Sequence, residues 1–168
     1  DLLDVAERHL QKGHYGTARD LFQEVINSSD DAEHVSRARR GHEIAVHRET
    51  MAAQLGEWRA KLEQAWPGAP FVLRMDNDGL ALELTNAGVG DLAPLRGMPL
   101  TSIYCAGNRI ADLGPLTGLP LRTLNCGGNP VASLEPLRGM PLATLLCECC
   151  RVSSLEPLRG MPLTMLNC

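Results

Sequence analysis

The segment Pro94-Leu95-Arg96-Gly97-Met98-Pro99-Leu100 decides the fold, because it returns unchanged at 136–142 and at 157–163. A close variant begins at Pro115, and successive copies start 21 residues apart. Aligned on this segment, the chain holds repeat units that begin at Gly79, Leu100, Leu121 and Leu142, and a partial unit that begins at Leu163. A fixed period of this length indicates an array of similar structural units that stack on one another.

Apolar residues occupy the same positions in every unit. The fourth position holds Leu82, Ile103, Leu124, Leu145 and Leu166. Each unit opens with the pattern L-x-x-L-x-L/C, in which alternate residues of a short strand point to one side. We therefore predict one short strand per unit, with the strands parallel and the apolar side chains buried between units. Pro and Gly in the second part of each unit disfavour an α-helix, so extended or 3₁₀ segments should return the chain.

Two further positions predict internal ladders of identical side chains. The sixth position holds Cys105, Cys126, Cys147 and Cys168, and the ninth holds Asn108, Asn129 and Cys150. The Asn amides are expected to bond the backbone of their own turn and of the next coil. The cysteines are expected to pack as small, reduced hydrophobic residues, since their spacing is that of the repeat rather than of paired zinc knuckles. A zinc or redox role for Cys147, Cys149 and Cys150 is the alternative.

Residues 1–66 are predicted to be helical. Apolar residues at helical spacing within 1–30, interrupted near Gly13, predict a helical hairpin. Asp30 or Asp31 is expected to cap a further helix, which no Pro interrupts before its end at residue 66. Its apolar residues form a heptad-like stripe made of Ile44, Met51, Leu55, Trp58, Leu62 and Ala65. This stripe predicts packing either on the hairpin or on a partner helix, and the second choice would make a homodimer through helix 32–66.

The two halves are expected to meet at a linker over 67–70, which is rich in Pro and Gly. Two strands within 71–84 should form a β-hairpin around the turn signal Asp76-Asn77-Asp78-Gly79. This hairpin would cap the first edge of the parallel strands. The predicted fold class is α+β, with a helical segment at 1–66 and a repeat region at 71–168.

The repeat pattern resembles that of leucine-rich repeats. Its Asp-Leu-x-Pro-Leu ending is similar to the internalin-type bacterial subclass, and its Gly-Met-Pro-Leu junctions resemble repeat arms of planctomycete-type multidomain Ser/Thr protein kinases. The string Gly13-x-Tyr15-x-x-Ala18-x-x-x-Phe22 resembles the turn and second helix of a tetratricopeptide repeat (TPR). The leucine-rich-repeat likeness covers about half of the chain. It implies a parallel-strand solenoid with a hairpin cap.

In repeat proteins of this shape the concave strand face is the usual binding face. The third, fifth and seventh positions of each unit should point there. The predicted binding residues are Glu83, Ser102, Tyr104, Thr123, Asn125, Thr144, Leu146 and Glu148. Tyr104 and Leu146 are the expected anchors, with the carboxylates at the rim. The alternative is a solvated sheet surface that binds nothing.

Composition restricts the functional classes. The formal net charge is −4, which argues against nucleic acid as the main partner. The sequence lacks an apolar run long enough to span a membrane and a signal peptide, so we expect a cytoplasmic or intracellular location. It also lacks nucleophile-elbow, phosphate-loop and dinucleotide motifs. We therefore expect no catalytic residues, no metal and no cofactor.

The sequence thus predicts a non-enzymatic scaffold that binds a protein or peptide. Two alternatives are a regulatory or sensory, non-catalytic region of a larger bacterial Ser/Thr protein kinase and a dimerisation module. The chain begins at Asp1 without Met and ends six residues into a unit, so we expect that it is part of a longer protein.

Overall fold

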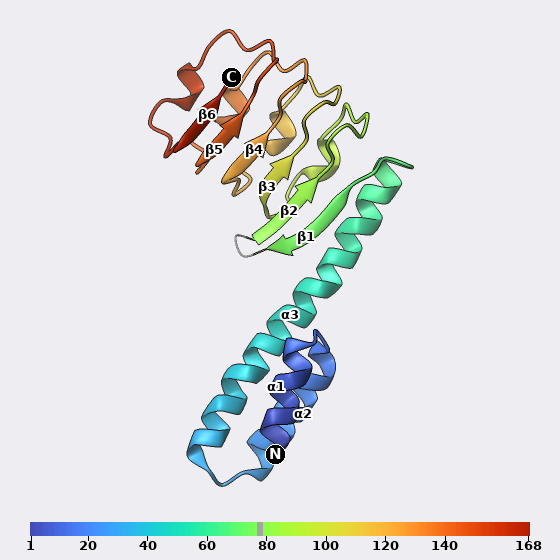
Figure 1. The fold of residues 1–168 in the computed structure, drawn as a ribbon, viewed down its shortest axis with the longest axis vertical. Coiled ribbons are helices and arrows are strands. Elements are labelled where there is room, and N and C mark those ends of the chain that lie inside the picture. Colours follow the sequence, from blue (N-terminus) through green and yellow to red (C-terminus); the bar gives the residue numbers. More distant parts are fainter. Residues whose placement is uncertain (77–78) are drawn as a thin grey trace. The chain divides into compact units, whose positions relative to one another are not determined.

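The computed structural model describes residues 1–76 and 79–168, which form an α+β structure (Figure 1). These residues contain three α-helices and one six-stranded, mostly parallel sheet. Asn77 and Asp78 of the predicted turn lie outside the described residues. The chain divides into two compact units, residues 1–57 and 58–168, and helix α3 (Ala32–Ala65) contributes to both.

The helical unit begins with the predicted hairpin, formed by α1 (Leu2–Gln11) and α2 (Tyr15–Ser28). The Asp1 carboxylate starts α1 as a capping box, because it accepts a hydrogen bond from the Asp4 backbone N–H at 2.9 Å. The unit's core consists of Leu3, Ala6, Ala18, Phe22, Val25, Ala38 and Ala45.

Asp31, rather than Asp30, caps α3. Its carboxylate accepts hydrogen bonds from the backbone N–H groups of Glu33 and His34 at 2.8 and 3.1 Å. These bonds, first of all those from His34, hold the pKa of the Asp31 carboxyl below its ordinary value. From this cap α3 runs as one helix of 34 residues and passes without a break through both of its glycines.

The face with which α3 meets the hairpin differs from the predicted one. Ala38 and Ala45 are buried in the hairpin core, whereas Ile44 of the predicted stripe is 46% exposed. Gly41, which lies between Ala38 and Ala45 in the sequence, packs against the Phe22 ring. Ile44 is therefore not buried against the hairpin, because small side chains make this contact and allow the helices a closer approach. The alternative that the stripe packs on a partner helix stays a prediction.

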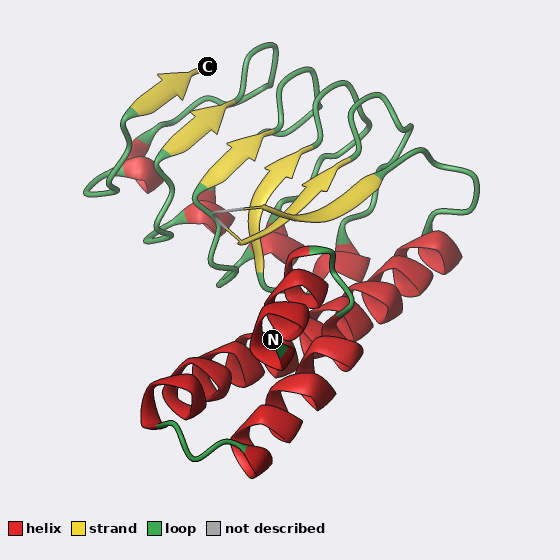
Figure 2. Ribbon diagram, turned by 60° about the horizontal axis from the view of Figure 1, so that its bottom comes forward, coloured by secondary structure: helices red, strands yellow, loops and turns green. Residues whose placement is uncertain are grey.

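The sheet follows the order β1-β2-β3-β4-β5-β6 (Figure 2). The antiparallel hairpin consists of β1 (Val72–Asp76) and β2 (Gly79–Glu83). The parallel strands that follow are β3 (Leu100–Tyr104), β4 (Thr123–Asn125), β5 (Thr144–Leu146) and β6 (Met165–Asn167). From β3 to β6 each residue that pairs with the next strand lies opposite the one that follows it by 21 positions, as the repeat predicts. Within the described residues the sheet is open and neither closes nor curls on itself.

Short 3₁₀ helices return the chain between the parallel strands, as predicted. They are η1 (Ala93–Leu95), η2 (Gly114–Leu116), η3 (Glu135–Leu137) and η4 (Glu156–Leu158). Two residues after each of them stands a glycine with a φ between 71° and 76°, at Gly97, Gly118, Gly139 and Gly160. Only Gly enters this left-handed region at little cost, which explains why every unit carries it.

In the second compact unit, residues 58–168, which we call the sheet unit, the core is built from the apolar positions that recur in each repeat. The fourth-position side chains of Leu82, Ile103, Leu124 and Leu145 are fully buried. Their equivalent in the edge strand β6, Leu166, is 44% exposed. Each repeat unit therefore depends on the neighbouring repeat unit for burial of its fourth-position side chain.

The Asn ladder forms as predicted, but it reaches backwards along the chain. The amide of Asn108 donates to the Leu84 and Cys105 carbonyls at 2.8 and 2.9 Å, and its oxygen accepts from the Val89 N–H at 3.0 Å. Asn129 repeats these contacts one unit later. Each amide thus binds its own turn and the preceding coil, not the next one. The Cys150 thiol, at the same position, donates to the Cys126 carbonyl at 3.3 Å.

The prediction of reduced cysteines is wrong for one pair. Cys147 and Cys168 form a disulfide, whereas Cys105 and Cys126 carry free, buried thiols. The Cα atoms of the bonded pair lie 4.4 Å apart, which is within disulfide range. The two cysteines directly follow β5 and β6, which pair in parallel with a register of 21 residues, so they lie next to each other.

Candidate functional site

Two rows of side chains lie on the face of the sheet opposite the buried fourth-position side chains. The fifth-position row is Glu83, Tyr104, Asn125, Leu146 and Asn167, and the third-position row is Ala81, Ser102, Thr123, Thr144 and Met165. We call these two rows the exposed sheet face. Since side chains alternate along a strand, the same register that buries the fourth position brings both rows together here.

Most of the predicted binding residues are accessible on the exposed sheet face. Glu83 is exposed, and the central residues Tyr104, Thr123, Asn125, Thr144 and Leu146 are half-buried. Glu148, in the turn after β5, is also exposed. The neighbouring strands therefore bring together side chains that lie far apart in the sequence.

Ser102 is an exception, because it is only 5% exposed. It lies in β3 between Ala81 of β2 and Thr123 of β4. Its short hydroxymethyl group is covered by its surroundings in this interior strand. The Ser102 side chain is therefore less accessible than the other predicted binding residues.

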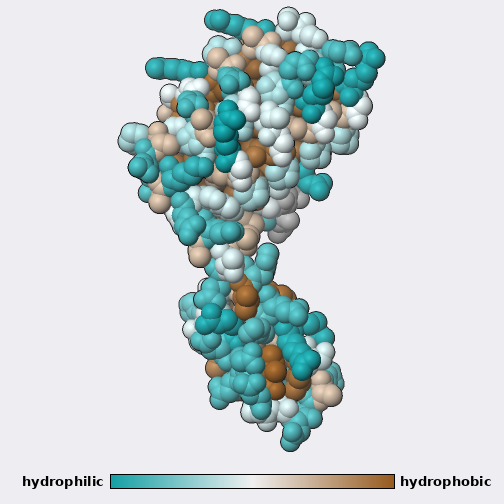
Figure 3. Space-filling model, turned by 180° about the vertical axis from the view of Figure 1, so that it is seen from behind, coloured by the Kyte–Doolittle hydropathy of each residue, from teal (hydrophilic) through white to brown (hydrophobic). Residues whose placement is uncertain are grey.

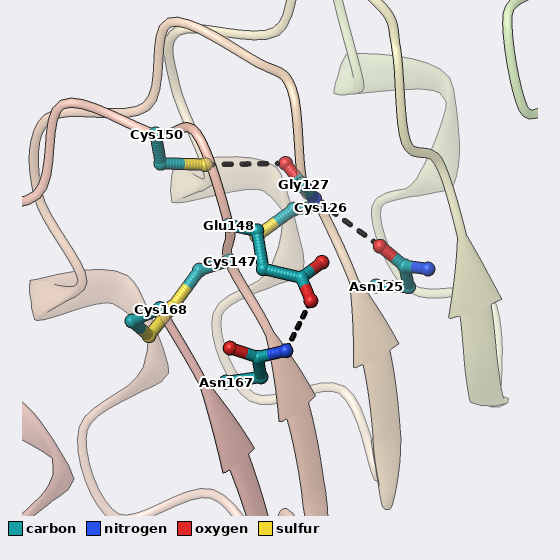
Figure 4. Close-up of a disulfide and its surroundings, with 8 residues drawn as sticks. All are labelled: Asn125, Cys126, Gly127, Cys147, Glu148, Cys150, Asn167 and Cys168. Carbon is teal, nitrogen blue, oxygen red and sulfur yellow. Dashed lines mark hydrogen bonds between the residues drawn. A yellow bond between two sulfur atoms is a disulfide. The ribbon is translucent and has the colours of Figure 1, made fainter.

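Both predicted rim carboxylates already have partners. Glu83 pairs with the Arg74 guanidinium of β1 at 3.1 Å, and Glu148 accepts a hydrogen bond from the Asn167 amide (Figure 4). These contacts lie at the surface, where ion pairs contribute little to stability. They fix the position of each carboxylate.

Sequence reasoning missed two residues of this face. Val72 lies opposite Glu83 and is 49% exposed, and Arg74 lies opposite Ala81. Both belong to β1, which joins the sheet in the antiparallel direction and has no place in the repeat alignment. The turn signal Asp76-Asn77-Asp78-Gly79 in the sequence could have found them, since a short turn signal between two strands predicts the register of a hairpin.

Asn125 has a structural role besides its position on the face. Its side-chain oxygen accepts a hydrogen bond from the Gly127 backbone N–H at 3.2 Å (Figure 4). Gly127 is buried, and a Cβ atom there would lie 3.3 Å from the Glu148 carbonyl oxygen. The Asn side chain therefore helps to turn the chain where the backbone of the next unit passes closely.

Among residues 1–76 and 79–168, no group of three or more His, Cys, Asp or Glu side chains is arranged to hold a metal ion. Burial raises the pKa of the Cys105 thiol to about 12, and burial likewise raises the pKa of Cys126. These two thiols stay protonated near neutral pH and are poor nucleophiles.

Comparison with known proteins adds no relative. No protein-family model matches the chain, and a search of the curated proteins finds no significant match. In the described part of the chain, no helix combines the length and the apolar character needed to cross a lipid bilayer.

Proposed function

We propose that residues 71–168 are a leucine-rich-repeat solenoid whose exposed sheet face binds a protein or peptide partner. The in-register row from Glu83 to Asn167 is the observation that carries this proposal. This row sets Tyr104 and Leu146 on a surface that otherwise consists mainly of short polar side chains.

The composition of this face suits binding. Thr123 and Thr144, which lie near the anchors, have few rotatable bonds, so their ordering on binding costs little side-chain entropy. Tyr104 offers a large aromatic surface and a hydroxyl group, a combination that is common at interfaces. Because Glu83 and Glu148 already have partners, contact area rather than charge should provide most of the affinity.

A matched pair of threonine substitutions tests the proposal. Thr123→Arg places a long cation in the centre of the face, whereas Thr117→Arg places it after η2, at an exposed position outside the face. The intact chain and both variants serve as baits for proteins of the source cell. Partners captured by the intact chain and by Thr117→Arg should be lost with Thr123→Arg.

Removal of the anchors provides a second test. The double variant Tyr104→Ala, Leu146→Ala should weaken binding of a captured partner by at least about 2 kcal/mol, as is usual for interface hot spots. Unchanged affinity in this variant, with its fold intact by circular dichroism, would reject this face as the binding surface.

Self-association through α3 is a second candidate function. Ile44 and Val46 are exposed apolar residues on this helix, and Figure 3 shows apolar surface among hydrophilic side chains on the helical unit. A second copy could bury Ile44 in a helix pair, whereas Val46, two residues further along the helix, points to another side. A monomer mass that does not change with concentration in sedimentation experiments would dismiss this candidate. If the chain is a dimer, Ile44→Glu should dissociate it.

A further inference from the structure

The turn that joins α1 to α2 (Figure 1) brings two histidines together. The Nδ1 atoms of His9 and His14 lie 3.2 Å apart, and the ring centroids lie 5.4 Å apart with an angle of 46° between the ring planes. His9 is half-buried and His14 is exposed, so both side chains are accessible to solvent. The two imidazoles contribute nothing to the core of the helical unit.

The backbone of the turn holds the pair in place, because α1 ends in a Schellman motif. The Gly13 N–H donates to the Leu10 carbonyl at 3.2 Å, and Gly13 has the left-handed φ, 80°, that this motif requires. The His14 N–H donates to the His9 carbonyl at 3.0 Å. In this motif the side chains of the two residues joined by the second bond meet, usually as a hydrophobic contact. Here that contact joins two imidazoles.

The same sequence spacing has the opposite result in α3. His42 and His47 are also five residues apart, but both lie inside a continuous helix. Five residues of an α-helix correspond to a rotation of about 140° beyond one full turn, so these two side chains point in different directions. The convergence of His9 and His14 therefore depends on the turn, which explains why the spacing alone does not predict it.

The distance between the two Nδ1 atoms is that of two ligands on one metal ion. With metal–nitrogen bonds of about 2.0–2.1 Å and tetrahedral angles, two imidazole nitrogens lie about 3.3 Å apart. The observed 3.2 Å matches this separation without a change in the backbone. Neutral imidazole suits Zn²⁺, Cu²⁺ and Ni²⁺, whereas Mg²⁺ and Ca²⁺ prefer oxygen ligands.

We propose that His9 and His14 form a binding site for a divalent transition-metal ion of the Zn²⁺ type, which both imidazoles coordinate through Nδ1. Without the ion, one ring donates an Nδ1–H group to the Nδ1 atom of the other. When the ion binds, that ring exchanges its proton with water and carries it on Nε2, so both Nδ1 lone pairs become ligands.

Two protein ligands make this a weaker site than the structural zinc sites, which have four. Among residues 1–76 and 79–168 no third His, Cys, Asp or Glu completes the group, so water fills the remaining positions on the ion. The ion links the last turn of α1 to the start of α2. Because it binds the folded turn better than the unfolded chain, it stabilises the helical unit.

Zinc titration of the intact chain, followed by the imidazole proton resonances in NMR spectra, tests the site. Zn²⁺ should shift the His9 and His14 resonances, while those of His42 and His47 stay unchanged. Zinc bound to the free thiols of the chain leaves the His9 and His14 signals in place, so this measurement reports on the histidine pair. His9 and His14 resonances that do not respond to a large excess of Zn²⁺ would overturn the proposal.

Substitution of either ligand tests whether the two imidazoles hold the ion together. His9→Asn and His14→Asn should each weaken zinc binding at the remaining imidazole by about a hundredfold, because the second ligand acts at a high effective concentration. His47→Asn is the matched control, since it removes an exposed imidazole from α3 and should leave binding unchanged. Undiminished affinity in either ligand variant, with its fold intact by circular dichroism, would show that the pair does not chelate the ion.

Thermal unfolding tests the stabilising effect. Zn²⁺ should raise the unfolding midpoint of the helical unit in the intact chain and in His47→Asn, and the rise should increase with zinc concentration. In His9→Asn and His14→Asn the same zinc concentrations should give no rise. An equal rise in all four chains would place the stabilising ion elsewhere and contradict the proposed link between α1 and α2.

Discussion

Gly41 of α3 lies directly against the aromatic ring of Phe22 in α2. A Cβ atom at Gly41 would come within 2.7 Å of the three outer ring atoms Cζ, Cε1 and Cε2. Gly56 in the same helix has no atom within 4 Å of the corresponding position. A side chain added at Gly41 would therefore clash with the core, whereas one added at Gly56 would not.

Alanine at these two positions should have effects of opposite sign. Gly41→Ala should destabilise the helical unit by roughly 1–3 kcal/mol, because the Phe22 ring must move in a packed core. Gly56→Ala should stabilise the helix by about 1 kcal/mol, since Ala is the better helix former. Denaturant unfolding followed by far-ultraviolet circular dichroism measures both. Equal stabilisation by the two variants would contradict the observed packing.

Removal of one ladder amide should be costly. Asn108→Ala leaves the Leu84 and Cys105 carbonyls and the Val89 N–H without this partner in a buried site. We expect a loss of roughly 3 kcal/mol in the free energy of unfolding of the sheet unit. The exposed neighbour provides the control, because Arg109→Ala should change stability by less than about 0.5 kcal/mol.

Restoring an amide to the ladder should be favourable. At the ninth position Cys150 has one weak donor, whereas Asn129 donates to two carbonyls at 2.9 Å and accepts from the Ile110 N–H. Cys150→Asn should therefore raise the free energy of unfolding by about 1 kcal/mol. Cys150→Ala, which provides no hydrogen bond, should not raise it.

Cys149 occupies a backbone conformation that suits glycine. Its φ is 56°, and the equivalent residues one and two units earlier, Gly128 and Gly107, have φ values of 65° and 66°. Cys149→Gly should stabilise the sheet unit by about 1 kcal/mol, because a Cβ atom is unfavourable in this region. Cys149→Val should destabilise it, and thermal unfolding of the two variants would measure the difference.

Alkaline pH should weaken the sheet unit. Burial raises the pKa of Cys105 from 9.0 to about 12, so the folded state holds this proton more tightly than the unfolded state does. The thiol's full contribution is present below pH 9 and is lost progressively as the pH rises toward 12. Unfolding of the intact chain and of Cys105→Ala at a series of pH values should show a smaller decline in the variant. Parallel curves would contradict the burial of an un-ionised thiol.

The 21-residue period was sufficient to predict the strands and their register. It places Ile103 opposite Leu124 without any knowledge of the turns, because identical units that bury the same side chain stack in one way. The period could not predict the burial of the Ser102 side chain, because this burial depends on the surrounding side chains rather than on the position of Ser102 in the repeat unit. The period also could not distinguish the bonded pair Cys147–Cys168 from Cys105 and Cys126, since all four occupy the sixth position but the last two are free thiols.

The helical unit shows where pattern reasoning is weakest. The apolar stripe through Ile44 predicts a packing face for the hairpin or for a partner helix, while the contact with the hairpin is made through Ala38, Gly41 and Ala45. Hydrophobicity alone favours the larger residue. Close approach of two helices depends instead on small side chains opposite one large ring, here that of Phe22.

The constant register of 21 residues restricts which insertions and deletions the repeat region can accept during evolution. If residues 121–141 were removed, Tyr104 would lie opposite Leu146 with the same alignment that each now has with Asn125. Loss or duplication of a whole unit leaves every remaining strand pair intact, while a change of any other length shifts apolar side chains out of the core. Homologous chains should therefore differ in the length of this region by multiples of 21 residues, as expected if recombination between near-identical gene segments changes the copy number.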